Sequence, residues 1–140
     1  MACSRVEGFK KSVGYALRRE LPGVPYNAAV ERVSGALKAE GFGVLTKIDI
    51  KSTLKEKLDI DYKPYVILGA CNPELSYQAL AADDNIGLVL PCNIVVAETE
   101  TGSEVAIARP ESILSMADSP DVLPVAEEAE SRLRRVLENL

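Results

Sequence analysis

The 140-residue sequence contains no histidine and no tryptophan. The missing histidine excludes Ser-His-Asp and Cys-His catalysis within one chain, and it excludes any metal site that uses imidazole ligands. A general acid or base would have to be a carboxylate, lysine, tyrosine or cysteine whose pKa is shifted by its surroundings. The sequence therefore identifies no reaction, and it leaves open whether the protein is an enzyme.

Long apolar runs and a surplus of positive charge are also lacking. The net charge is −5, from 16 basic and 21 acidic residues. Nucleic-acid binders show a basic patch or stripe, so we expect no nucleic-acid partner. The apolar run at residues 86–90 is far shorter than the ~20 residues that a membrane-spanning helix needs, so we expect no membrane partner.

Cysteine is scarce, with Cys3, Cys71 and Cys92 as its only positions. The odd number, together with an N-terminal stretch that lacks the apolar segment of a secretory signal, favours a reducing cytoplasm. Cys71 and Cys92, without any histidine, offer only two soft metal ligands, so we expect no structural zinc site and no cofactor. Binding of Cu(I), or of a metal shared across a dimer, stays open.

The length fits one domain. Residues 1–11 are expected to form a flexible leader, and residues 12–140 a single domain. Alternating apolar residues predict strands, whose expected ranges are 12–21, 43–50, 64–70, 86–98 with an interruption at Pro91, and 104–109. Helical periodicity predicts helices, whose expected ranges are 25–40, 52–58, 73–82, a short segment after Pro110, and 122–139.

This order of elements predicts an α+β fold. We expect a two-layer domain in which a mixed sheet of about five strands has helices packed mainly on one face. The first two strand connections are compatible with either a parallel crossover or an antiparallel arrangement. Side chains expected to point inward from the middle helices include Leu54, Leu58, Leu75, Ala79 and Leu80.

The stretch Pro64–Pro73, PYVILGACNP, is the most informative part of the chain. Its apolar run predicts a central strand, and Asn72 followed by Pro73 predicts the start of a helix. A cysteine at this point, Cys71, lies at the positive end of the helix dipole, which lowers a thiol pKa, and free N–H groups there can bind an anion. The alternative is that Cys71 is a small buried residue and Asn72 only a cap.

A second Cys-Asn pair, Cys92-Asn93, follows Pro91 in the predicted fourth strand. A backbone bend at this proline is expected, and bends of this kind occur next to active sites more often than elsewhere. Cys71 and Cys92 would converge if the third and fourth strands are neighbours. The candidate ligand-binding residues are Cys71, Asn72, Cys92, Asn93 and Tyr65.

Residues 41–80, with the following segment IGLVLPCNIVV and the closing segment PVAEEAESRLRRVLENL, resemble a known family. They are similar to the bacterial and archaeal domain of unknown function 302. The resemblance implies an α+β domain that forms a homodimer. It implies no activity, because none is established for the family. Asp59 stands where relatives often have glycine at a helix end, a position where aspartate tolerates the left-handed conformation.

Three functions remain in view. The first is a small cytoplasmic homodimeric binding or accessory module, which takes a small anionic or thiophilic ligand at the Cys71 and Cys92 turn. The second is a thiol-based redox or sulfur-handling protein that uses Cys71 with Cys92 as its partner. The third is a purely structural or interaction protein, in which the dimer face is the function.

Overall fold

The computed structural model describes residues 14–140, so the predicted leader and the start of the predicted first strand lie outside the described residues. The strands are β1 (Ala16–Pro22), β2 (Gly43–Asp49), β3 (Tyr65–Cys71), β4 (Cys92–Glu98) and β5 (Gly102–Ala108). The α-helices are α2 (Tyr26–Ala39), α3 (Ile50–Leu58), α4 (Pro73–Ala82), α5 (Pro110–Ile113) and α6 (Leu123–Glu138). Short 3-10 helices are η1 (Ile86–Val89), η2 (Leu114–Met116) and η3 (Pro120–Val122).

The five strands form one sheet in the order β1-β5-β4-β3-β2, and every neighbouring pair is antiparallel. The predicted α+β fold with about five strands is confirmed. The sheet is antiparallel throughout instead of mixed, because α2 carries the chain from one edge strand to the other and not to a neighbouring strand. The neighbours β2 and β3 are connected through α3 as a long hairpin, which requires opposite strand directions.

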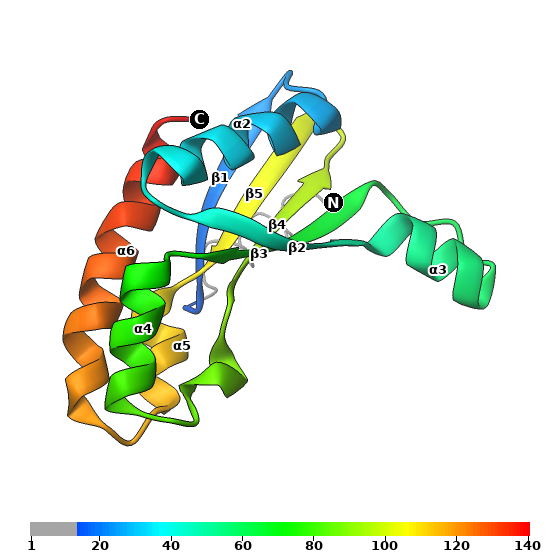
Figure 1. Ribbon diagram of the computed structural model, residues 1–140. Helices are drawn as coiled ribbons and strands as arrows, with labels where there is room; N and C mark the ends of the chain where they lie inside the picture. The colour runs from blue at the N-terminus through cyan, green and yellow to red at the C-terminus, as the bar shows by residue number, and fades with distance from the viewer. Residues whose placement is uncertain (1–13) are drawn as a thin grey trace.

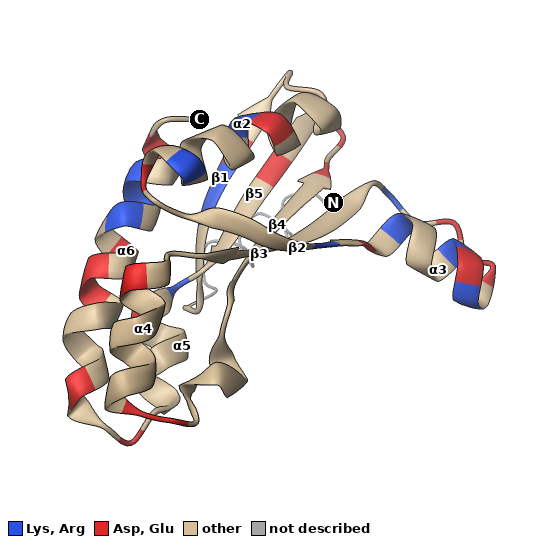
Figure 2. Ribbon diagram, in the orientation of Figure 1, with Lys and Arg blue, Asp and Glu red and all other residues tan. Residues whose placement is uncertain are grey.

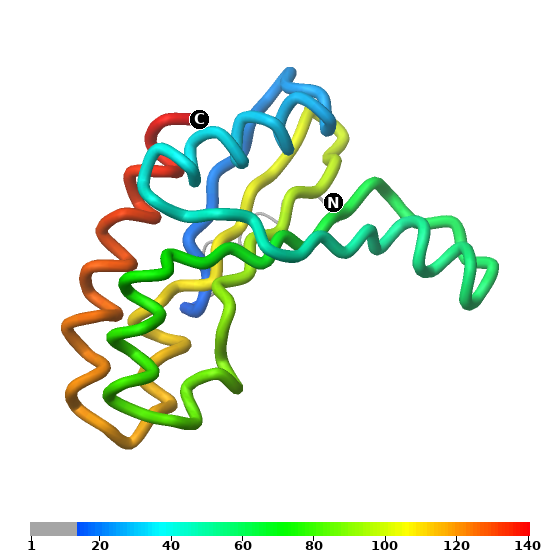
Figure 3. The backbone as a smooth tube through the Cα atoms, viewed as in Figure 1, coloured from blue at the N-terminus to red at the C-terminus, as the bar shows by residue number. Residues whose placement is uncertain are grey.

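Helices α2, α4, α5 and α6 pack on one side of the sheet, whereas α3 extends away from the body (Figure 1). The largest fully buried side chains between the layers include Leu37, Leu68, Ile94, Ile107 and Leu133. The last turns of α6 lie beside the end of α2, where Arg135 pairs with Glu40 at 3.0 Å (Figure 3). The core therefore lies between the sheet and these helices.

Strand alternation divides the sheet residues into two faces. The helix-covered face carries buried residues such as Leu17, Val66, Leu68, Ile94, Val96, Val105 and Ile107. The opposite face, which we call the open face, carries residues that lie in register across the strands, among them Ile48, Ile67, Val95, Ala106 and Arg18. The open face is thus apolar over much of its area, which is unusual for a sheet face that meets water.

The segment formed by residues 43–63, here called the arm, contains no buried residue. The prediction that Leu58 points inward is wrong, because its side chain is 62% exposed on α3, a helix that contains no buried residue. In α4, the predicted inward residues Leu75 and Ala79 are buried, but Leu80 is 41% exposed at the edge of the packed stripe. Both helices form as the apolar period predicts. The period does not reveal how much of each apolar face the rest of the protein covers.

Two strand predictions are also corrected. Residues Ile86–Val89 form a 3-10 helix instead of the first half of a strand, because the Asp83 carboxylate accepts from the Asn85 N–H at 2.9 Å and tightens the chain into turns. Within the described residues the first strand begins at Ala16, so Tyr15, which the predicted strand 12–21 includes, precedes it and is 62% exposed.

The helix ends follow the sequence signals. Gly41 has φ of 84° after α2, and Asp59 has φ of 55° after α3, the left-handed conformation expected at each position. None of the helices within residues 14–140 is both long and apolar enough to cross a bilayer.

Glu130 on α6 is a buried carboxylate that the apolar pattern of this helix does not reveal, with 3% of its surface exposed. Its oxygens accept from Arg109 Nε at 2.9 Å, Arg134 Nη2 at 3.0 Å and the Glu111 N–H at 3.1 Å. Burial raises the pKa of this carboxyl, but the three hydrogen bonds outweigh burial, so the pKa is lowered overall. The carboxylate connects α6 to the start of α5.

Candidate functional site

The turn between β3 and α4 has the geometry that the sequence predicts. Strand β3 ends at Cys71, and Asn72 is the N-cap of α4, with Oδ1 accepting from the Leu75 N–H at 3.1 Å. Pro73 is the first residue of the helix, where its missing N–H costs nothing. Asn72 is buried, and its amide nitrogen lies so close to Gly41 that a Cβ there would meet it at 2.9 Å. The cap is therefore held from two sides.

The two predicted thiols lie at the same place in the fold. Strands β3 and β4 are neighbours, and Cys92 pairs in register with Ala70, the residue before Cys71. Both cysteines line one small cavity of about 20 Å³ on the helix side of the sheet. The Cys71 sulfur lies 2.9 Å from the Ser76 hydroxyl, with which it shares a hydrogen bond. Both cysteines are free thiols in the described part of the chain.

Burial changes the acidity of the Cys92 thiol. Burial raises the pKa of Cys92 to about 11, and the neighbouring Cys71 adds to the rise. The thiol therefore stays protonated at neutral pH. Cys92 also lines a second pocket of about 180 Å³, whose other walls include Leu88, Pro91 and Ile113. This pocket shares Leu90, Cys92 and Leu114 with the small cavity.

Asn93 and Tyr65 do not line the small cavity, although Asn93 lines the pocket of about 180 Å³ together with Cys92. Asn93 follows Cys92 directly, so strand alternation places it on the open face, where it is exposed. Tyr65 pairs with Ala97 on the same face and makes an edge contact with the Tyr62 ring at 6.1 Å between centroids. The five predicted residues thus divide into Cys71, Asn72 and Cys92 on one side of the sheet and Asn93 and Tyr65 on the other.

Asn93 and Tyr65 instead line a cavity of about 390 Å³ on the open face, here called the open-face groove. Its other lining residues include Tyr15, Arg18, Lys63, Glu104 and Ala106. Arg18 and Glu104 form an ion pair at 3.2 Å. Neither residue was predicted from the sequence. Each is a charged residue in a strand where apolar and other residues alternate, at a position that faces away from the buried residues. That pattern is the sequence signal that could have indicated them.

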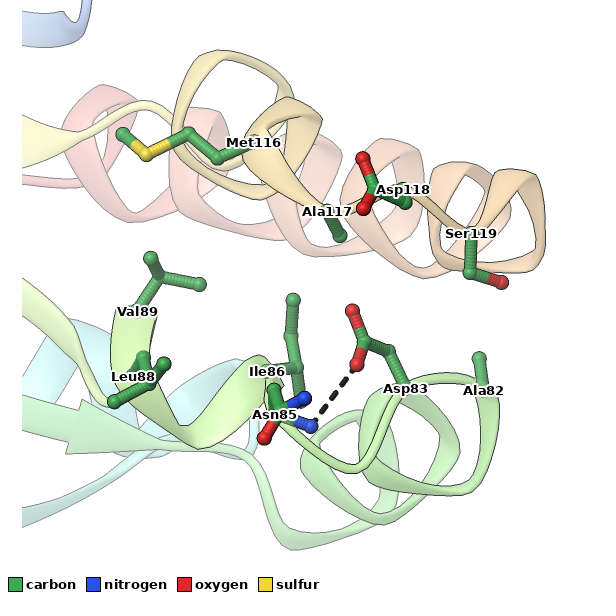
Figure 4. A pocket seen from close by; sticks show the side chains of 10 residues that line it. All are labelled: Ala82, Asp83, Asn85, Ile86, Leu88, Val89, Met116, Ala117, Asp118 and Ser119. Carbon is green, nitrogen blue, oxygen red and sulfur yellow. Dashed lines mark hydrogen bonds between the residues drawn. The ribbon is translucent and has the colours of Figure 1, made fainter.

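A third cavity, of about 510 Å³, lies between the end of α4 with η1 and the segment after α5. Figure 4 shows Asp83 and Asp118 on opposite sides of this cleft, together with the apolar side chains of Leu88 and Met116. Two carboxylates beside apolar walls suit a cation more than an anion. Among residues 14–140 no cluster of three or more cysteines or carboxylates could hold a metal ion.

Comparison with known proteins identifies the family to which the chain belongs. The model of the domain of unknown function DUF302 matches residues 17–140. A solved structure described as the uncharacterized conserved protein DUF302 from Bacillus stearothermophilus is similar, with a TM-score of 0.83 and 29% sequence identity over 91% of this chain and 98% of that chain. No curated protein matches. Both findings agree with the resemblance carried by the two Cys-Asn segments, and the chain belongs to the DUF302 family, whose function is uncharacterised.

Proposed function

We propose that the protein is a small homodimeric binding module of the cytoplasm, and that the thiols of Cys71 and Cys92 bind a thiophilic ligand. The observation that carries the proposal is that both cysteines line one cavity. The residues around that cavity include no lysine or arginine, and burial keeps Cys92 neutral, so a thiophilic ligand has more support there than an anionic one. Free thiols also suit a reducing compartment.

The size of the cavity limits the ligand. A volume of about 20 Å³ leaves room for a group of about the size of one water molecule. A single soft ion such as Cu(I) fits this limit, because thiolates are its preferred ligands and two of them suffice for linear coordination. Binding would release the thiol protons, so affinity should rise with pH.

Cu(I) itself is the probe that tests the thiol site. Competition with a chromogenic Cu(I) chelator, without oxygen, measures the affinity of the full chain. Because both thiolates contribute, Cys71→Ser and Cys92→Ser should each weaken binding about tenfold or more. Cys3→Ser is the matched control, and it should leave the affinity unchanged. Equal affinities for all four proteins would contradict the site.

A second candidate function is thiol–disulfide exchange, which the shared cavity also favours. The Cys71 thiolate would attack a low-molecular-weight disulfide and release one thiol, and Cys92 would then attack the mixed disulfide and release the second. The product would be a Cys71–Cys92 disulfide that has lost two hydrogen atoms. Mass spectrometry after incubation with oxidised glutathione tests this candidate. Accumulation of glutathione adducts without the internal disulfide would count against it.

The homodimer part of the proposal is supported by the arm. Six of its large apolar side chains are exposed, namely Val44, Leu45, Ile48, Leu58, Ile60 and Tyr62. A nine-residue helix and an edge strand that bury nothing are marginal in isolation, so they need a surface to cover them. The arm carries five lysines and four acidic residues, whereas the rest of the chain has 11 basic and 17 acidic residues. Charge complementarity therefore favours a second copy of the chain as its cover.

Solution mass tests this surface. Light scattering after size-exclusion chromatography should give a dimer for the unaltered chain and a monomer, or a weakened dimer, for Leu58→Glu. Leu88→Glu is the matched control, because Leu88 is 87% exposed in η1, outside the arm. A monomeric unaltered chain would refute the homodimer. A Leu58→Glu protein that remains as dimeric as the control would refute only the arm as its surface.

A further inference from the structure

The open-face groove has the shape of a small-molecule site. Its volume of about 390 Å³ falls within the roughly 300–1,000 Å³ typical of ligand pockets. The floor is formed by Ala97, Ala106 and Ala108, whose short side chains alternate with the larger core residues of the same strands. Tyr15 and Tyr65 stand at its walls. The hollow therefore results from small side chains on the open face of β4 and β5.

The charge of the groove is opposite to that of the surrounding chain. Arg18 and Lys63 line it against one acidic residue, Glu104. Residues 64–131, which supply three of the five strands, contain twelve acidic residues and a single basic one, Arg109. Helix α4 accordingly displays acidic but no basic positions (Figure 2). The positive charge of the groove comes from Arg18 on β1 and from Lys63 just before β3.

Arg18 has a hydrogen-bonding group that the described residues leave unused. Its Nη1 pairs with Glu104 at 3.2 Å, which fixes the guanidinium against the strand floor. Its Nε is buried and has no hydrogen-bond partner in the described part of the chain. A buried donor without a partner is uncommon in folded proteins, because the group has lost its water and gained nothing in return.

We propose that the open-face groove binds a small organic anion with a flat apolar body, such as an aromatic carboxylate. The carboxylate lies toward Arg18 and Lys63, because a guanidinium donates paired hydrogen bonds to carboxylate oxygens. The ring lies over the alanine floor between the tyrosines, where aromatic contacts and apolar burial stabilise it. Glu104 holds Arg18 in place and disfavours a second negative charge, so a monoanion is the preferred ligand.

This site is independent of the proposed thiol site, since Cys71 and Cys92 do not line the groove. Naphthalene-2-carboxylate is the probe, titrated into the full chain by calorimetry, with the neutral naphthalene-2-carboxamide as the ligand control. The carboxylate should bind about tenfold or more tightly than the amide. Arg18→Gln and Lys63→Gln should each reduce carboxylate affinity severalfold, and Lys57→Gln on α3 is the control with the same loss of charge.

A variant that fills the groove with a larger side chain keeps the test valid if Arg18→Gln fails to fold. Ala106→Leu places a larger side chain on the open face, in the floor of the groove, and should abolish binding while thermal unfolding shows an intact fold. The proposal is overturned by equal affinity for carboxylate and amide, by no binding of either, or by Ala106→Leu and Lys63→Gln binding as well as Lys57→Gln. Cys71→Ser with Cys92→Ser should leave this affinity unchanged, which separates it from the proposed function.

Discussion

The raised pKa of Cys92 makes a quantitative prediction about its reactivity. In a Cys3→Ser/Cys71→Ser protein, Cys92 is the remaining thiol, and burial, the larger cause of its raised pKa, is retained. At about pH 8 a thiol with the ordinary pKa of 9.0 is about one-tenth thiolate, whereas one with a pKa of about 11 is about one-thousandth thiolate. Because the thiolate is the nucleophile, and because Cys71→Ser removes the smaller cause of the raised pKa, alkylation of Cys92 should be slower than that of a free cysteine by up to about 100-fold.

Alkylation by iodoacetamide, followed by mass spectrometry over a range of pH, measures this rate. The same protein unfolded in concentrated urea is the internal control, because its Cys92 thiol is solvated. In the folded protein the rate should keep rising with pH beyond the point where the unfolded protein levels off. Folded Cys92 that reacts within about threefold of the unfolded rate near pH 8 would refute the assignment of a neutral, buried thiol.

Three further predictions concern the elements that support these sites. Glu130→Gln should lower the free energy of unfolding by about 2–4 kcal/mol near neutral pH, because it leaves arginine donors poorly paired. Glu128→Gln, on the exposed side of α6, is the control and should lower it by less than ~1 kcal/mol. Urea unfolding measures both. The pKa of Glu130 is lowered in the folded state. The stabilisation by its carboxylate is therefore present above the pKa of the unfolded state and is lost as pH falls through the pKa of the folded state. The free energies of unfolding of Glu130→Gln and Glu128→Gln should therefore converge in acid. Asn72→Ala should cost about 1 kcal/mol through loss of the α4 cap, which urea unfolding also detects. Gly69→Ala should destabilise more than Gly87→Ala in thermal unfolding, because a Cβ at Gly69 would collide with the Thr46 hydroxyl, whereas one at Gly87 meets no atom.

Local signals predicted the parts of the fold that depend on local chemistry. Asn72 with Pro73 marks the start of α4 because a side-chain oxygen and a missing N–H both suit a helix N-terminus. The salt bridges of Glu128 with Arg132 and Glu130 with Arg134 follow from the i, i+4 spacing alone. These features need no knowledge of the tertiary structure.

The predictions that are wrong concern features that depend on the tertiary structure. The apolar side chain of Leu58 has the spacing of a buried residue, but α3 projects from the body and leaves it exposed. The run at Ile86 has strand-like composition, yet the turn closed by Asp83 and Asn85 makes it a 3-10 helix. Burial of Glu130 depends on Arg109 at the end of β5, and no periodicity within α6 contains that information.

The same reasoning explains why the thiol pair was predicted and the open-face groove was not. Cys71 and Cys92 stand out as rare residues, and their convergence needed only that β3 and β4 be neighbours. Arg18 and Glu104 are ordinary charges on β1 and β5, and their pairing depends on the register that sets Arg18 opposite Ala106. A shift of β1 by one residue would send Arg18 to the helix-covered face and break the pair.

Cys92 and Asn93 show how one strand can serve both candidate sites. They are adjacent in β4, and alternation directs Cys92 to the helix-covered face and Asn93 to the open face. The ligands would therefore lie on opposite sides of the sheet, with the backbone of β4 between them and no shared side chain. The small cavity and the groove share no lining residue, so the binding energy of an ion confined to the small cavity should add to that of the groove ligand. The pocket of about 180 Å³ adjoins both, because it is lined by Cys92 and by Asn93 and Ala108 of the groove. A measured dependence of Cu(I) affinity on naphthalene-2-carboxylate would require contact through this pocket or a change of the sheet itself between two arrangements.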